Sequence, residues 1–215
     1  MRVQETDDGV DIMDGPAEHT ARGHRRALTK GPALAIRTFL GVRPPAGPSL
    51  SGEDAMTRAP RAVRLRGFRA GDAPALHAIF HRAVRDGTRS LYSPAERRAW
   101  SPAPAPPPWW AGRFRGQITV VALHDGAPCG FMTLGRDGHL DFAYVLPAFH
   151  GTGIAARLHD EILRRARRLG LRRLETEASL IGRRFFLKHG WSEGARIVHR
   201  FGDETLSAMR MSREV

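Results

Sequence analysis

The chain has 215 residues, a formal net charge of +12 at neutral pH, 41% hydrophobic residues and one cysteine. This apolar content is enough for a hydrophobic core, but no apolar run reaches the roughly eighteen residues that cross a bilayer, so we expect no membrane partner. Because a single cysteine forms no internal disulfide, the sequence favours a reducing compartment, and we expect a cytoplasmic protein.

The first 56 residues differ in composition from the rest. They hold seven basic and eight acidic residues and a Pro/Gly/Ser cluster at 44–52, and we expect a disordered N-terminal extension. A methionine at position 56 also raises the hypothesis that translation starts there. Residues 57–215 hold 27 basic and 14 acidic residues and form the predicted folded domain.

The first part of this domain reads as one strand followed by two helices. Apolar residues alternate at 63–65, and Asp72 with Pro74 predicts the start of a helix that runs to about residue 85. A capping-box pattern at 93–96 predicts the second helix.

Three further residues have reactive or aromatic side chains whose role has to be weighed. Trp109 and Trp110 follow a proline-rich loop and could line a substrate entrance, but we interpret them as packing residues. Cys129 lies at the start of a predicted strand, and we interpret it as a packed thiol rather than a nucleophile.

The second half of the chain alternates between strand and helix patterns separated by glycine-containing turns. The predicted strands are 118–123, 130–134, 140–145, 173–177, 195–201 and 205–211, and the predicted helices are about 153–169 and 179–188. A mixed α/β fold, with one sheet flanked by helices, is the expected class.

The most informative segment joins the strand that ends at residue 145 to the next helix. Its sequence at 150–155 is His-Gly-Thr-Gly-Ile-Ala. A glycine-rich turn at a helix N-terminus leaves backbone N–H groups directed outward at the positive end of the helix dipole, which favours phosphate binding. Gly151 and Gly153 let an anion approach the backbone and permit positive φ.

Two other phosphate-binding motifs fit this segment less well. The dinucleotide fingerprint needs a third glycine where Ala156 stands, although Glu175 and Glu177 lie near its acidic position. The nucleoside-triphosphate loop needs Gly-Lys-Ser/Thr, which is absent. The pattern therefore predicts a pyrophosphate cradle made of backbone, without a metal ligand.

Residues 145–155 resemble the acetyl-CoA-binding motif of the GNAT superfamily of acyl-CoA-dependent N-acyltransferases, and 177–191 resemble its second motif. The resemblance covers about 61–213. It implies a mixed, mostly antiparallel sheet in which two strands splay apart to hold the pantetheine arm of CoA. It also implies acetyl-CoA as cosubstrate without a metal, a primary amine of a small molecule or protein as acceptor, direct attack in a ternary complex, and a homodimer as one assembly.

The same resemblance assigns the cofactor site. The implied acetyl-CoA-binding residues are Tyr144, Val145, His150, Gly151, Thr152, Gly153, Ile154, Ala155 and Phe186. Backbone N–H groups near Tyr144 and Val145 would polarise the thioester carbonyl. His150 stands where the family has Arg or Gln.

The catalytic residues are less well defined. Asp141 and Glu177 are the candidate general bases, and an ion pair with a neighbouring arginine is the structural alternative for each. Asp141 is predicted to share a strand face with residues 143 and 145. Phe186 replaces a family tyrosine that protonates the leaving thiolate, so Ser179, Tyr144 or water would have to do so.

Three functions remain open from the sequence. An N-acetyltransferase leads, and a catalytically weak or inactive CoA-binding module is the alternative that Phe186 suggests. A basic nucleic-acid-binding protein is the third, suggested by the arginines at 157–173. We interpret those arginines as a solvated face and expect no nucleic-acid partner, because no reader motif and no interleaved aromatics accompany them.

Overall fold

The computed structural model describes residues 38–39 and 63–215 of the chain. The predicted extension of residues 1–56 therefore lies outside the described residues except for β1, Thr38–Phe39. The proposed translation start at Met56 also lies outside them.

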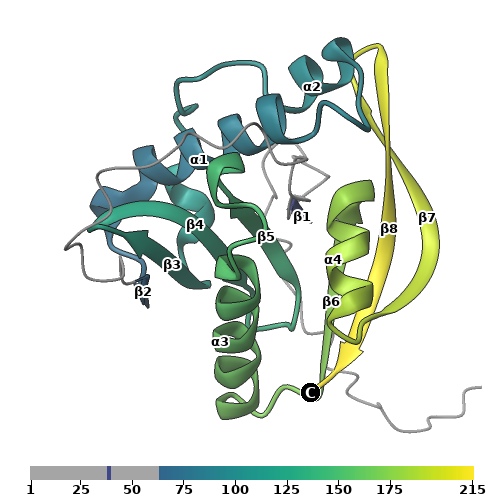
Figure 1. The fold of residues 1–215 in the computed structure, drawn as a ribbon. Coiled ribbons are helices and arrows are strands. Elements are labelled where there is room, and N and C mark those ends of the chain that lie inside the picture. The colour runs from purple at the N-terminus through teal and green to yellow at the C-terminus, as the bar shows by residue number, and fades with distance from the viewer. Residues whose placement is uncertain (1–37, 40–62) are drawn as a thin grey trace, which may run out of the picture. The chain divides into compact units, whose positions relative to one another are not determined.

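Every helix and strand predicted from residue 63 onward is present (Figure 1). The helices are α1 Ala73–Gly87, α2 Pro94–Trp100, α3 Ile154–Arg168 and α4 Leu180–Lys188, with 3-10 turns η1 Ala70–Asp72, η2 Ala111–Phe114 and η3 Pro147–Phe149. The strands after β1 are β2 Arg64–Gly67, β3 Ile118–His124, β4 Ala127–Leu134, β5 Leu140–Val145, β6 Arg173–Ser179, β7 Ser192–Phe201 and β8 Glu204–Glu214.

The last two strands are longer than the sequence pattern indicated. β7 begins at Ser192 rather than near residue 195, and an irregularity between Glu193 and Arg196 shifts its register with β8. Such an irregularity hides the alternation on which the sequence prediction depended.

The strands form one sheet in the order β2-β3-β4-β5-β1-β6-β8-β7. β2 to β5 are antiparallel neighbours, as are β6, β8 and β7, whereas β1 lies parallel to both β5 and β6. The predicted mixed, mostly antiparallel sheet is confirmed.

The sheet opens between β5 and β6. At one end the two strands are close, since the Glu175 N–H donates to the Gly138 carbonyl at 3.0 Å. Further along, Thr38 of β1 pairs with both Ala143 and Ala178, so the strands have separated by the width of an inserted chain (Figure 1). The predicted splay is therefore present.

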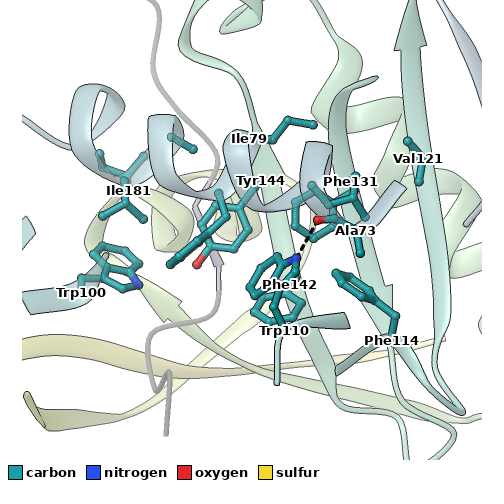
Figure 2. Packing of buried hydrophobic residues seen from close by; sticks show 14 of the residues in the cluster. Ala73, Ile79, Trp100, Trp110, Phe114, Val121, Phe131, Phe142, Tyr144 and Ile181 are labelled. Atoms are coloured by element: carbon teal, nitrogen blue, oxygen red, sulfur yellow. Dashed lines mark hydrogen bonds between the residues drawn. The ribbon is translucent and has the colours of Figure 1, made fainter. Parts of the chain in front are cut away.

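Separate hydrophobic clusters cover the two faces of the sheet. α1 and α2 pack on one face over an aromatic cluster that includes Trp100, Phe142 and Tyr144 (Figure 2). α3 packs on the other face through residues such as Leu158 and Ile162. This division fixes which strand side chains face α1 and α2 and which face α3.

The tryptophan and cysteine interpretations agree with the structure. Trp110 is buried, and its Nε1–H donates to the Ala73 carbonyl at 2.8 Å (Figure 2). Trp109 is partly buried against the same cluster. Cys129 is buried, its thiol donates to the Ala122 carbonyl at 3.4 Å, and burial raises its pKa to about 11. A thiol in that state is a poor nucleophile.

Asp72 occupies the predicted N-cap position of α1, but its carboxylate does not cap that helix. It accepts instead from the Arg69 N–H at 2.7 Å and from the Arg66 guanidinium at 2.6 and 2.8 Å. The hydrogen bond from Arg66 lowers the pKa of Asp72, so this side chain ties β2 to the start of the helical layer. At the second helix, the predicted capping box between Ser93 and Glu96 is present in both directions.

Among the residues that the structure describes, no helix has both the length and the apolarity to span a membrane.

Candidate functional site

A cradle of backbone N–H groups lies where β5 passes through η3 into α3. Gly151 and Gly153 have φ of 78° and 83°, which a side chain would strain. Gly153 is the N-cap of α3 without a side-chain capping bond, and a Cβ added there would meet no atom within 4 Å. The first-turn N–H groups of α3, at Ile154 and Ala155, therefore face an open approach at the positive end of the helix.

Two side chains of this turn bond to the protein's own backbone. The His150 Nε2 lies 3.3 Å from the Val145 carbonyl, and the Thr152 hydroxyl donates to the Phe149 carbonyl at 2.7 Å. Both contacts hold the shape of the turn. The cradle accordingly presents backbone donors, and its side chains fix their direction.

One N–H group of β5 is directed toward the opening in the sheet. The Leu146 N–H donates to the Cys129 carbonyl of β4 at 2.9 Å. Because N–H groups alternate in direction along a strand, the Val145 N–H faces the β6 side and the Tyr144 N–H faces β4. The Tyr144 ring is buried in the aromatic cluster, 5.1 Å from the ring centroid of Phe80 (Figure 2).

The structure places Asp141 in a buried ion pair. Both carboxylate oxygens accept from the Arg113 guanidinium, at 2.8 and 2.9 Å, and the Gln117 amide donates to one of them at 3.1 Å. The guanidinium also lies over the Phe142 ring, 5.3 Å from its centroid. The arginine partner that the sequence left as an alternative is therefore present for Asp141.

The predicted face of Asp141 is wrong. A register shift between Thr133 and Leu134 breaks the alternation of β5 next to Asp141. Ala143 packs in the hydrophobic cluster under α3, and Phe142 packs in the cluster under α1. The Arg113 guanidinium, which is bonded to Asp141, lies over the Phe142 ring. Asp141 therefore faces the α1 side with Phe142, not the α3 side with Ala143. A bulge of this kind leaves no clear sign in the sequence.

Glu177 lies on β6 beside the opening in the sheet. Since β1 aligns Ala143 with Ala178, Glu177 is level with Phe142 on β5. Its side chain is 26% exposed, and one carboxylate oxygen lies 3.3 Å from the Nε2 of His199 on β7. Glu177 is thus a partly exposed carboxylate near the gap, with an imidazole for a neighbour.

Ser179 and Phe186 lie at the start of α4 and within it, and both side chains are buried. Ser179 is the N-cap, and its hydroxyl oxygen accepts from the Gly182 N–H at 3.1 Å, as the sequence predicted. Phe186 is fully buried against Trp191, with ring centroids 4.7 Å apart. In this structure its ring forms part of the packing between α4 and α3.

Sequence reasoning missed His199 and Arg113. His199 is 22 positions from Glu177 on a strand that β8 separates from β6, and Arg113 lies in a 3-10 turn that no pattern indicated. Arg113 and His199 are one arginine and one histidine among many others of the same types in the sequence. Only the pairing of distant strands distinguishes these residues.

A sheet divided beside a helix N-terminus, with backbone N–H groups at the opening, is an arrangement suited to binding a phosphate-bearing cosubstrate. The family model described as "Acetyltransferase (GNAT) family" matches residues 85–191. A GCN5-related N-acetyltransferase from Rhodopseudomonas palustris is 30% identical, with a TM-score of 0.67, over 76% of this chain and 100% of that structure. The chain belongs to the GNAT family and is an acetyl-CoA-dependent N-acetyltransferase by family.

Two other proteins support this assignment. The uncharacterized N-acetyltransferase YafP of Escherichia coli K12 is 26% identical over 129 residues, which cover 60% of this chain and 81% of YafP. The PaiA N-acetyltransferase from Thermoplasma acidophilum, solved in complex with coenzyme A, is 15% identical with a TM-score of 0.58, over 72% of this chain and 99% of that one. The second likeness concerns the fold alone.

Proposed function

We propose that this protein transfers the acetyl group of acetyl-CoA to a primary amine of a small molecule or a protein, by direct attack in a ternary complex. When bound, acetyl-CoA supplies the acetyl group as an activated thioester. The observation that carries the proposal is the glycine cradle at the N-terminus of α3, placed at the opening between β5 and β6.

The cradle and the gap suit different parts of one elongated cosubstrate. Unpaired N–H groups at a helix N-terminus favour a pyrophosphate, and Gly153 leaves room for it. The gap already accommodates an extended backbone, β1, in register with both edges, so it suits an arm that carries amide groups. The Val145 N–H then points to where a thioester carbonyl would lie, as an oxyanion donor.

We assign the general base to Glu177 rather than to Asp141. Asp141 is held by the Arg113 guanidinium, which always carries a positive charge, and both of its carboxylate oxygens already accept from that group. Glu177 is partly exposed beside the gap. In the reaction the amine nitrogen bonds to the acetyl carbon, Glu177 takes the amine proton, and the C–S electrons leave with the sulfur.

The leaving thiolate needs a proton that Phe186 cannot give. Ser179 at the end of β6 is the candidate donor, because its side chain carries an O–H group near the gap and its oxygen is the acceptor in the Gly182 bond. Position 179 is level with Tyr144 across the gap. Water is the alternative donor.

The first experiment is calorimetric titration of acetyl-CoA into the full chain and into Gly153→Glu. We expect the substitution to weaken binding by at least about 100-fold, because it strains the turn and puts a carboxylate in the anion cradle. Gly170→Glu is the matched control, since Gly170 also has positive φ (71°) and open space but follows the other end of α3. Equal binding by the parent and by Gly153→Glu would refute the cradle.

The second experiment looks for the acceptor. Thiol release from acetyl-CoA is measured with butylamine, 1,4-diaminobutane, phosphinothricin and a peptide with an N-terminal alanine. Turnover with any of them supports the proposal, whereas tight binding without turnover in a wider amine panel would indicate a CoA-binding module instead.

The remaining proposals concern location and assembly. A cytoplasmic location is supported by Cys129, the single cysteine of the chain, because it is a free, buried thiol and a reducing compartment keeps thiols free. A homodimer stays a prediction. Size-exclusion chromatography with light scattering, which measures the molar mass in solution, is its test.

A further inference from the structure

The contact between Glu177 and His199 lies near the gap and joins two strands that are not neighbours in the sheet. The Nε2 of His199 on β7 lies 3.3 Å from the Glu177 carboxylate on β6, with β8 between the two strands. The side chains of His199 and Glu177 are 14% and 26% exposed, so the pair lies at the edge of the solvent. Because neither an adjacent strand nor a helical turn brings them together, the pair exists only through the fold.

We propose that His199 is a positioning residue for acyl transfer, which holds the Glu177 carboxylate in the orientation that accepts the amine proton. The inference rests on the proposed function and on Glu177 as its general base. In the reacting complex the Nε2–H of His199 is donated to one carboxylate oxygen, from a position that already lies 3.3 Å away. The amine proton goes to the Glu177 carboxylate as the C–N bond forms and the C–S bond breaks. His199 itself gains and loses no proton in this step.

Geometry explains why Glu177 needs such a partner. A general base has to come within about 2.6–3.2 Å of the proton it removes, and a glutamate side chain has three rotatable bonds that let it leave that position. An N–H donor on one oxygen restricts those rotations. In this structure the Nε2 of His199 is buried and lies 3.3 Å from the carboxylate without a hydrogen bond of good geometry. Catalytic hydrogen bonds of this kind become well aligned only when the reacting complex forms.

Comparison with Asp141 explains why an imidazole suits the task. The buried Asp141 is bonded to Arg113, whose guanidinium cannot give up its charge. An imidazole carries no permanent charge, so its contact with a carboxylate differs in kind from that of a guanidinium. Asp141 is thus held by a permanent cation, whereas Glu177 lies beside an imidazole.

Four full-chain proteins test the proposal: His199→Leu, His199→Gln, Glu177→Gln and the double variant with His199→Leu and Glu177→Gln. The probes are acetyl-CoA and whichever of butylamine, 1,4-diaminobutane, phosphinothricin and the alanine peptide the parent acetylates. We expect His199→Leu to lower kcat about 10- to 100-fold with an unchanged KM for acetyl-CoA. His199→Gln, whose amide keeps an N–H donor at a similar reach, should stay within about three-fold of the parent.

The double variant separates positioning from mere stability. If His199 acts through Glu177, His199→Leu causes no further loss of kcat once Glu177 is glutamine. A parent-like kcat in His199→Leu, an equal loss in His199→Gln, or an additive loss in the double variant would each overturn the proposal. A parent that neither binds acetyl-CoA nor turns over any probe would overturn the proposed function first, and this inference with it.

Discussion

Among single residues, His159 on α3 is a buried histidine whose pKa lies far below its ordinary value. It is 1% exposed, and its Nε2 accepts the Trp191 Nε1–H at 2.9 Å. Burial, with added repulsion from His189 and Arg213, lowers its pKa to about 3. The folded protein therefore holds a neutral imidazole in the packing between α3 and α4.

This residue makes stability depend on pH. In the unfolded chain a histidine has a pKa of about 6.5, so below that pH the unfolded state is protonated at this residue. In the folded state His159 stays neutral down to about pH 3. The free energy of unfolding should fall as the pH drops, by up to about 1.4 kcal/mol per pH unit from this residue.

Replacing His159 with glutamine should remove that dependence, because the amide does not titrate and its oxygen can still accept from Trp191. We expect His159→Gln to lose clearly less stability than the parent between about pH 6.5 and 5. Urea unfolding at several pH values measures this. Parallel pH curves for the two proteins would show that His159 is not the cause.

Among the elements, β1 has the most direct bearing on function. It is two residues long, yet Thr38 pairs with both edges of the gap between β5 and β6. If the pantetheine arm of acetyl-CoA lies in this gap, the arm and β1 compete for the same backbone groups of β5 and β6. The chain would then weaken its own cosubstrate binding by the free energy that holds β1 in place.

Thr38→Pro tests this competition, because proline has no N–H to donate to a strand. We expect the variant to bind acetyl-CoA a few-fold more tightly than the parent in calorimetry, since β1 would leave the gap more easily. Identical dissociation constants would mean that β1 and the cosubstrate do not share the gap.

For the whole molecule, charge is the property most open to test. Residues 57–215 hold 27 basic and 14 acidic residues, and basic side chains such as Arg157, Arg164 and Arg168 line the exposed side of α3. Some of this charge is neutralised locally, as where Glu161 bonds to Arg164 and Arg165. The excess still gives a field that attracts polyanions.

Acetyl-CoA binding should therefore weaken with salt. Between about 50 and 300 mM NaCl we expect the dissociation constant to rise about three- to ten-fold, because the Debye length falls over that range. The same titrations with a short DNA duplex as competitor test the nucleic-acid alternative. Displacement of acetyl-CoA by the duplex near physiological salt would favour the nucleic-acid alternative. A dissociation constant for acetyl-CoA that does not change with salt would contradict attraction of the cosubstrate by the basic surface.

The sequence by itself determined the elements and the cradle. Strand and helix periodicities are local, and so are the capping box at Ser93, the cap at Ser179 and the glycine turn before α3, because each depends on residues within one or two turns of chain. The class of fold and the glycine turn before α3 could therefore be predicted before any contact was known, while phosphate binding by that turn stays a prediction.

Tertiary structure decided which carboxylate pairs with a guanidinium and which lies beside an imidazole. Asp141 and Glu177 look alike in sequence, but a bulge in β5 places Asp141 beside Arg113, and the β7–β8 hairpin brings His199 to Glu177. The same holds for β1, whose two residues have no strand pattern of their own and pair only because the edges of β5 and β6 stand apart. Long-range pairing, register shifts and side-chain reach create these contacts, and none of them has a local signature in the chain.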